Sequence, residues 1–150
     1  MKTKIEINGQ KVEITLTPEQ VAEIKAKAVN YEDLGTIEAV FEYLGMNYEE
    51  WKEKHEELED HVQAYMELTY VAKAYNGGEW MDYDDTDVTK YYPYFNASGS
   101  AAGFSCGDYY FDRSDSVVGS RLCFKDSARA MNAGKKFLKI YDRYINPRNK

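Results

Sequence analysis

The 150-residue sequence has few prolines, cysteines and histidines: three, two and two. It contains no apolar run of the roughly 20 residues that a membrane-spanning helix needs. Its first residues, MKTKIEINGQ, lack the apolar stretch of a secretory signal. We therefore expect a cytoplasmic protein without membrane association, in which Cys106 and Cys123 are reduced thiols. The composition, 43% hydrophobic and 30% charged, is typical of a folded globular chain and excludes a disordered one.

Charge is divided unevenly along the chain. Residues 1–112 carry 9 basic against 23 acidic residues, a net charge of −14, whereas residues 113–150 carry 10 against 3, a net charge of +7. Such a basic tail either folds back on the acidic part or meets an external polyanion. We favour the first interpretation because the whole chain carries −7, whereas nucleic-acid-binding domains usually have a basic footprint.

The first 30 residues predict a β-hairpin followed by a helix. Apolar and polar residues alternate in 5–7 and 12–16, and the Asn8-Gly9 pair between them is typical of a tight hairpin turn. Thr17-Pro18 predicts the start of a helix that runs to about residue 30. We divide the chain here into a hairpin-helix appendage, residues 1–30, and a main domain, residues 31–150.

Helical patterns dominate the next segment. Thr36 is a suitable cap for a short helix over 37–44, and Asn47 with Glu50 has the spacing of a capping box that opens a long helix over 48–75. Positions 51, 55, 58, 62, 65, 69 and 72 of that helix form a heptad seam, which is suited to pairing with another helix. Its second half, from residue 62, is apolar nearly all round, so either other elements of the chain or a second copy must cover it.

Three short runs rich in aromatic and branched residues predict strands at 91–96, 103–111 and 120–125. Pro93 cannot donate a backbone hydrogen bond, so the first run should be an edge strand. A last helix is expected from Ala128 to about Ile145. The predicted fold class is α+β: a three-stranded antiparallel sheet packed against a long central helix and a C-terminal helix, with an N-terminal β-hairpin plus helix.

Signals of catalysis or metal binding are weak. His55 and His61, six residues apart on a helix, point in different directions and cannot share a metal. The acidic run 82–87 lacks the glycine and glutamate of a calcium-binding loop, and the two cysteines lack zinc-ligand spacing. We expect buried cysteines, a solvated acidic loop, no catalytic residue, no metal and no cofactor.

Aromatic density is the feature that exceeds background. Residues 80–111 contain ten aromatic residues, and side chains alternate across a strand, so adjacent aromatic pairs place one ring on each face of the sheet. One face can pack on the helices, which leaves the other free to contact a partner. The residues hypothesised to bind a partner are Trp80, Tyr91, Tyr92, Tyr94, Phe95, Tyr109, Tyr110 and Arg121.

A basic stripe follows the last predicted helix. Its members, spaced by 7, 3 and 4 residues, are Arg129, Lys136, Lys139 and Arg143. The stripe could bind a polyanion such as single-stranded nucleic acid. Alternatively, it solubilises the helix or pairs with the acidic helix, which is the ordinary design of a surface helix.

Several strings in residues 71–150 resemble a family of small uncharacterised proteins of phages and integrated mobile elements of Bacteroides-type bacteria. These strings are VAKAYN (71–76), KYYPYF (90–95), GSRLCFK (119–125) and AGKKFL (133–138). The chain has Asn-Gly-Gly-Glu-Trp at 76–80 where members of the family often carry Asn-Glu-Gly-Trp. The resemblance implies a host-cell cytoplasmic context and a phage or mobile-element origin, and it implies no reaction and no catalytic residue.

Three functions remain open from the sequence. The favoured one is a non-enzymatic accessory protein that self-assembles through the hairpin and the heptad seam, or binds a phage or host protein through its aromatic face. The second is a binder of single-stranded nucleic acid, which the net charge disfavours. The third is a nucleotide or small-ligand binding protein, or an enzyme, with a pocket near Arg121, Tyr109 and Cys123.

Overall fold

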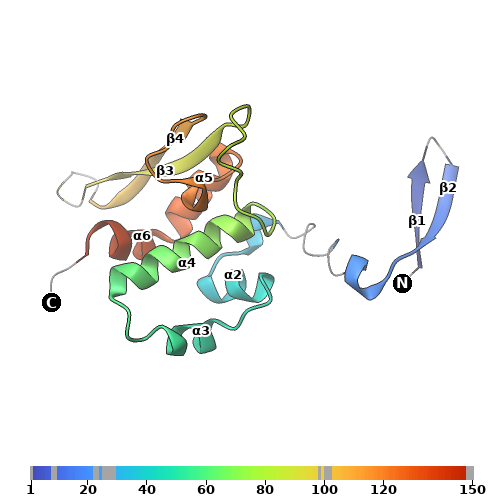
Figure 1. Cartoon of the computed structure of the whole chain (residues 1–150), viewed down its shortest axis with the longest axis horizontal. Coiled ribbons are helices and arrows are strands. Elements are labelled where there is room, and N and C mark those ends of the chain that lie inside the picture. Colours follow the sequence, from blue (N-terminus) through green and yellow to red (C-terminus); the bar gives the residue numbers. More distant parts are fainter. Residues whose placement is uncertain are drawn as a thin grey trace.

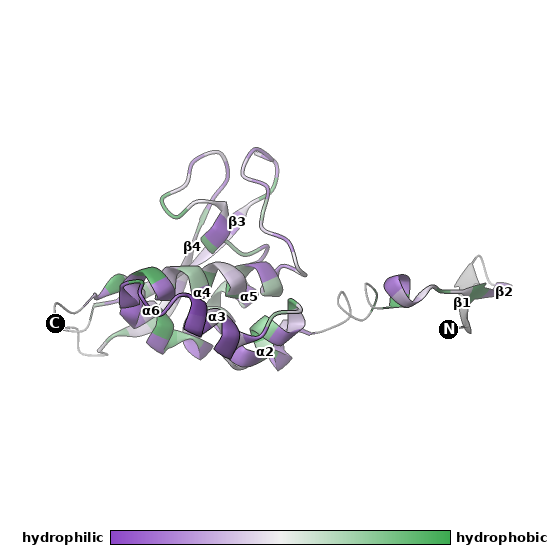
Figure 2. Cartoon of the chain, turned by 60° about the horizontal axis from the view of Figure 1, so that its bottom comes forward, coloured by the Kyte–Doolittle hydropathy of each residue, from purple (hydrophilic) through white to green (hydrophobic). Residues whose placement is uncertain are grey.

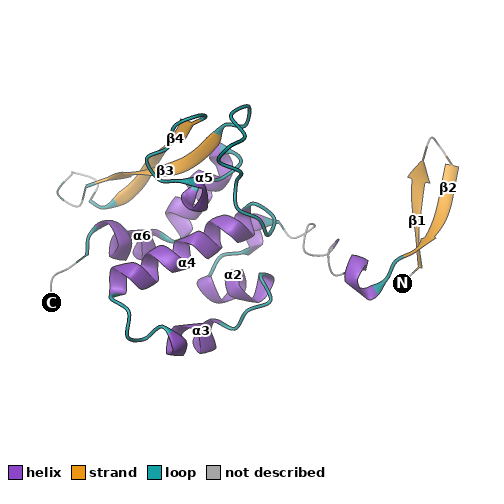
Figure 3. Ribbon diagram, in the orientation of Figure 1, coloured by secondary structure: helices purple, strands orange, loops and turns teal. Residues whose placement is uncertain are grey.

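The structure, a computed structural model, describes residues 2–7, 10–21, 24, 30–97, 99 and 103–147. It is α+β, as predicted (Figures 1 and 3). The elements are β1 (Lys2–Ile7), β2 (Gln10–Thr15), the 3-10 turn η1 (Tyr31–Asp33), α2 (Ile37–Tyr43), α3 (Tyr48–Lys54), α4 (Asp60–Tyr75), β3 (Lys90–Asn96), β4 (Ser105–Asp112), the 3-10 turn η2 (Ser120–Leu122), α5 (Ser127–Lys136) and α6 (Leu138–Ile145).

The predicted N-terminal hairpin is confirmed. β1 and β2 pair antiparallel, with Ile5 opposite Val12 and Ile7 opposite Gln10; the predicted turn at 8–9 lies outside the described residues. Thr17 begins a helical turn, because its hydroxyl accepts from Gln20 N at 3.2 Å while Gln20 Oε1 accepts from Thr17 N at 3.0 Å. Positions 18–21 are helical, and most of the predicted helix beyond them falls on residues that the structure does not describe.

Local capping signals place the starts of α2 and α3 where the sequence predicts them. Thr36 Oγ1 accepts from Ala39 N at 3.3 Å, and Asn47 Oδ1 accepts from Glu50 N at 3.0 Å. Gly45, with a φ of 73°, allows the left-handed turn that ends α2. Each of these interactions spans only a few residues, so the sequence pattern alone predicts it.

The predicted single helix over 48–75 is wrong, because it breaks between α3 and α4. The chain turns at His55, whose backbone φ is −118°, and Gln63 Nε2 donates to the backbone carbonyls of His55 and Leu58 at 3.1 and 2.9 Å. The break lets α3 fold back so that Trp51 packs edge-on against Phe41, with ring centroids 5.2 Å apart. The predicted heptad seam is therefore not one continuous stripe: Trp51 is buried, whereas Leu58 is 39% exposed.

The main core surrounds α4, which lies between α2 and α3 on one side and α5 on the other (Figure 1). Tyr75 near its end contacts the rings of Phe124 and Phe137, with centroids 5.8 and 6.0 Å apart. Leu68 and Val71 are fully buried. Of the two alternatives that the sequence left open, elements of the same chain cover the apolar second half of this helix.

The predicted third strand at 120–125 is also wrong. Gly119, with a φ of 68°, and the Ser116 hydroxyl, which accepts from Gly119 N at 2.7 Å, turn the chain into η2. Only Phe124 reaches the sheet, where it exchanges two backbone hydrogen bonds with Tyr91 at 2.9 and 2.7 Å. The sheet in this part of the chain therefore consists of β3 and β4 alone.

The C-terminal helix starts and ends where predicted, and it is interrupted once. Asp126 caps it by accepting from Arg129 N at 2.8 Å, and it ends at Ile145. The interruption at Phe137 divides it into α5, which covers one face of the sheet, and α6, which packs on α4. Figure 2 shows β3 and β4 rising from this layer of helices.

Candidate interaction surface

Strand β4 is paired on one side only. Its partner is β3, with Tyr91 opposite Phe111, Pro93 opposite Tyr109 and Tyr92 opposite Tyr110. Among the described residues, no backbone hydrogen bond reaches β4 from the side away from β3. Residues 107–111 are all exposed, so this edge of the sheet is open to solvent.

The direction of the free backbone groups follows from the pairing of Tyr91. Its N–H and C=O point away from β4, because they bond to Phe124. Pairs in an antiparallel ladder alternate between hydrogen-bonded and non-hydrogen-bonded, so Phe111, opposite Tyr91, also directs its N–H and C=O away from β3. The same holds for Tyr109, two residues earlier. These two residues direct their backbone groups toward the side of β4 that no other strand pairs with.

One of the free N–H groups already has a partner from its own strand. The Asp108 carboxylate accepts from Tyr109 N at 2.8 Å. Pro93 lies opposite Tyr109 and has no N–H to donate. No ladder hydrogen bond is lost at Pro93, because the backbone nitrogen at this position points away from β4. Among the described residues, the Phe111 N–H has no backbone partner.

Aromatic rings border the edge on both faces of the sheet. Tyr109 and Phe111 share a face with Tyr91, at centroid distances of 5.7 and 6.0 Å, and Tyr110 lies on the opposite face beside Tyr94, at 6.4 Å. Tyr94 and Tyr110 are each 58% exposed, Phe111 is 56% exposed and Tyr109 is 37% exposed. We call this set, Tyr94, Tyr109, Tyr110 and Phe111, the β4 aromatic surface.

The expectation that one whole face of the sheet is free is wrong. Lys90 and Tyr92 point to the outer face, yet Lys90 is fully buried and Tyr92 is 8% exposed. Lys90 Nζ donates to the backbone carbonyls of Asp85, Val88 and Arg113, so the loops before β3 and after β4 cover this end. The exposed rings instead belong chiefly to β4, on both of its faces.

The residues hypothesised to bind a partner therefore separate into groups. Tyr94, Tyr109 and Tyr110 belong to the β4 aromatic surface. Tyr91 is half-buried, and Phe95 packs into the core with a centroid distance of 4.6 Å to Tyr141. Phe111 was missing from the hypothesised set, because the sequence does not say which of the adjacent Tyr110 and Phe111 a helix covers; the structure leaves both exposed.

Trp80 and Arg121 lie together at the end of α4. The Trp80 indole N–H donates to Thr69 O at 2.8 Å, and its ring lies near two cations, with Lys73 Nζ at 4.7 Å and Arg121 Cζ at 5.6 Å from its centroid. The ring is 38% exposed. These contacts attach the segment that follows α4 to the helix. Trp80 therefore has a structural role in addition to its partial exposure.

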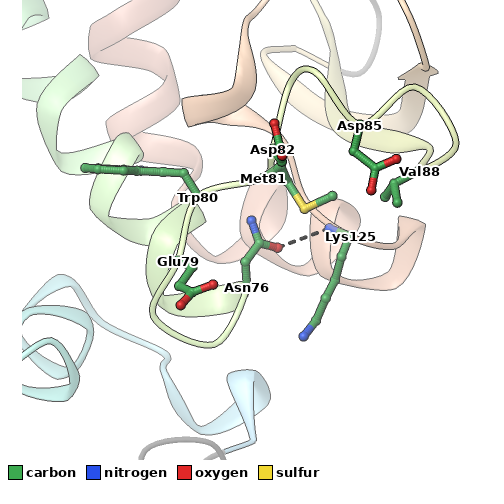
Figure 4. A pocket seen from close by; sticks show the side chains of 8 residues that line it. All are labelled: Asn76, Glu79, Trp80, Met81, Asp82, Asp85, Val88 and Lys125. Atoms are coloured by element: carbon green, nitrogen blue, oxygen red, sulfur yellow. Dashed lines mark hydrogen bonds between the residues drawn. The ribbon is translucent and has the colours of Figure 1, made fainter.

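A shallow depression of about 260 Å³ adjoins Trp80 (Figure 4). Its lining includes Glu79, Asp82 and Asp85 together with Lys125. Asn76, also in the lining, donates to Cys123 O at 2.8 Å and accepts from Lys125 N at 3.1 Å, so it joins α4 to the segment after η2. None of the three residues of the predicted ligand pocket, Arg121, Tyr109 and Cys123, is among its lining residues.

Acidic groups bracket the β4 aromatic surface. Asp108 and Asp112 precede and follow the three consecutive aromatic residues of β4. The acidic loop at 82–87 is exposed and is joined to the end of the strand, because Tyr83 OH donates to Ser114 O at 3.3 Å. The Asp112 carboxylate is turned inward, since its Oδ2 is buried. Asp108 and the acidic loop are therefore the groups that favour a cationic partner at this edge.

The basic stripe on α5 and α6 has mostly internal partners. Arg143 donates to Asp60 Oδ1 and to Glu67 Oε2, both at 2.8 Å. Arg129 pairs with Asp126 and lies over the Tyr31 ring at 4.5 Å. Lys136 donates to the Glu32 carbonyl, and Lys139 is exposed. Pairing with the acidic helix, one of the two interpretations of the stripe, is thus seen directly at Arg143.

The cysteines and histidines show no reactive arrangement. Burial raises the pKa of the Cys123 thiol to about 11 and also raises that of Cys106, so both thiols stay protonated at neutral pH. His55 stacks on Trp51 at 4.5 Å, and His61 lies 3.4 Å from Glu59. Within the described ranges, no group of three His, Cys, Asp or Glu side chains is arranged to hold a metal ion.

No described helix combines the length and apolarity needed to cross a membrane. Comparison with known proteins found no match to a family model, to a curated protein or to a solved structure. The resemblance to phage and mobile-element proteins therefore stays a prediction.

Proposed function

We propose that this protein is a non-enzymatic interaction module that binds an extended segment of a partner protein along the free edge of β4. The observation that carries the proposal is the outward-directed Phe111 N–H, which has no backbone partner among the described residues, in an exposed strand bordered by aromatic rings on both faces. An extended segment added to such an edge gains main-chain hydrogen bonds, while its alternate side chains contact the rings on either face.

The edge at Phe111 lacks several of the usual protections against strand addition. Natural edge strands are blunted by charged side chains, especially lysine, by proline, by β-bulges or by a covering segment. Protection of this kind is found at the start of the edge, where a bulge interrupts the register beside Tyr94 and Phe95 and Asp108 accepts from the Tyr109 N–H. Residues 107–112, GDYYFD, contain neither lysine nor proline, and among the described residues no segment pairs with them. Tyrosine is suited to a surface that alternates between solvent and a partner, because its ring stacks while its hydroxyl stays hydrated.

The partner segment should be basic and should alternate apolar with polar residues. The exposed Asp108 precedes the rings, and the acidic loop at 82–87 is joined to the segment that follows the strand. Lysine or arginine in the added segment would therefore be attracted, whereas a phosphate backbone would be repelled. If the resemblance in sequence holds, the partner is a phage or host protein.

Selection from a library of random short peptides on the immobilised full-length protein tests this function. We expect the selected peptides to alternate apolar residues and to contain lysine or arginine. Phe111→Pro should weaken their binding about tenfold, because it removes the outward N–H, a loss of about 1 kcal/mol or more, and leaves the β3–β4 ladder intact. Phe111→Ala keeps the N–H and is the matched control for loss of the ring.

A second variant guards against a folding defect in the proline variant. Phe111→Lys keeps the backbone and adds the charge with which natural edges discourage pairing, so it should also weaken binding. Peptides without alternation, or binding that neither variant changes, would contradict the proposal. Binding of single-stranded DNA at low salt in preference to the peptides would instead support the nucleic-acid alternative.

A further inference from the structure

The chain contains two incomplete pieces of sheet. β3–β4 has one open edge, and β1–β2 is a two-stranded hairpin, which is only marginally stable in water without further strands or a covering helix. In Figure 1 the hairpin stands apart from β3–β4 and from the helices. Joining the two pieces would produce one four-stranded sheet.

We propose that the occupant of the β4 edge is the N-terminal hairpin, residues 2–15, of a second copy of this chain. This inference rests on the proposed function and names its partner. Because each copy has one hairpin and one open β4 edge, mutual exchange closes a symmetric dimer with two four-stranded sheets. Exchange of an identical element between protomers is a common route to dimers.

The hairpin has the chemistry that the edge favours. In the register of β1 and β2, pairs that contain branched apolar residues alternate with pairs that contain lysine. The first kind are Thr3–Ile14, Ile5–Val12 and Ile7–Gln10, and the second kind are Lys2–Thr15, Lys4–Glu13 and Glu6–Lys11, in which each glutamate is opposite a lysine. An added β1 would therefore alternate branched apolar residues, which suit the tyrosine rings, with two lysines and one glutamate, which give it a net charge of +1 toward the acidic residues near β4.

A second copy is favoured over the same copy by the placement of the hairpin. In the structure of one chain, the hairpin does not lie on its own β4, and that edge remains exposed (Figure 1). The main body begins at Tyr31, whose ring is held between Tyr75, at a centroid distance of 5.3 Å, and the guanidinium of Arg129. The main body thus begins at the η1 turn and not at the β4 edge.

Sedimentation of the full-length protein over a range of concentrations tests the inference. We expect a species of twice the 17.3 kDa monomer mass that accumulates with concentration. Phe111→Pro on the edge and Ile5→Asp in the hairpin should each weaken dimerisation about tenfold or more. Lys139→Ala, an exposed change on α6, should leave it unchanged.

Mixing the two defective variants distinguishes exchange between copies from docking within one copy. The Phe111→Pro chain keeps an intact hairpin, and the Ile5→Asp chain keeps an intact β4 edge. In a mixed dimer, the intact hairpin can pair with the intact edge, so one of the two hairpin-to-edge contacts forms, whereas neither forms fully in a dimer of one variant. We expect the mixture to dimerise more strongly than either variant alone. Hydrogen exchange at the Phe111 amide should slow as the wild-type dimer forms.

Three results would overturn the inference. A monomer with a protected Phe111 amide means that the hairpin docks on its own chain. A dimer that neither variant weakens means that another surface holds it. A monomer with an unprotected Phe111 amide means that no hairpin occupies the edge; the peptide selection then tests the proposed function independently.

Discussion

Gly134 in α5 lies so close to Pro93 in β3 that a Cβ at position 134 would come within 2.7 Å of the Pro93 Cβ. A Cβ at this position would also overlap the side chain of Cys106 in β4. The absence of a side chain at this glycine therefore sets the distance between the helix layer and the sheet that bears the β4 aromatic surface.

Gly134→Ala should destabilise the protein by about 1–3 kcal/mol, because the added methyl must displace two strand residues. Chemical denaturation measures the loss. Gly35→Ala is the matched control, since a Cβ there meets nothing within 4 Å and its φ is not in the left-handed region. Equal stability of the Gly134→Ala and wild-type proteins would show that the sheet can shift freely over α5.

Arg143→Ala should cost about 3 kcal/mol of unfolding free energy, because it leaves the carboxylate of Glu67, a 1% exposed residue, without its cation. Denaturation of Arg143→Ala, Glu67→Gln and the double variant provides the measurement. The double variant should recover part of the loss, since the neutral amide removes the uncompensated charge. Additive losses in the double variant would contradict a coupled pair.

Glu67 also gives the protein a dependence on pH in the acidic range. Burial raises the pKa of Glu67 above its ordinary value of 4.5, although Arg143 opposes the rise. The folded state then holds this proton more tightly than the unfolded state, so the Glu67 contribution to stability falls as pH increases through the raised pKa. Removing Arg143 should extend that fall to higher pH, and Glu67→Gln should abolish it; denaturation between pH 4 and 7 tests both.

Alkaline pH should destabilise the fold from about pH 9 upward. Burial raises the pKa of Cys123 from 9.0 to about 11, and it also raises those of Tyr75 and Tyr141. Because the unfolded chain releases these protons first, the stabilisation present below pH 9 is lost as pH rises through the folded pKa. The Cys123 share is at most about 3 kcal/mol, at about 1.4 kcal/mol per pH unit.

Cys123→Ala isolates the thiol from the tyrosines. Unfolding free energies measured at pH 7, 9 and 11 should decline less steeply in this variant than in the wild type. A parallel decline in the two proteins would assign the alkaline sensitivity to the tyrosines alone.

The sequence predicts the parts of this fold that depend on near neighbours. The hairpin and the helix starts at Thr17, Thr36, Asn47 and Asp126 follow from alternation and from capping side chains that bond within a few residues. Strands β3 and β4 follow from their aromatic runs. The α+β class and the order of these elements could therefore be predicted without coordinates.

Only the tertiary structure decided where the long helix breaks, which strands pair, and which rings stay exposed. No glycine or proline marks the break at residues 55–59, which accompanies the packing of Trp51 on Phe41, a residue of another helix. The run at 120–125 has strand-like composition, yet Gly119 and Ser116 turn it into η2. Exposure of Tyr110 and Phe111 depends on where α5 and the surrounding loops end, because burial results from contacts between residues distant in the chain, and a local pattern does not contain those contacts.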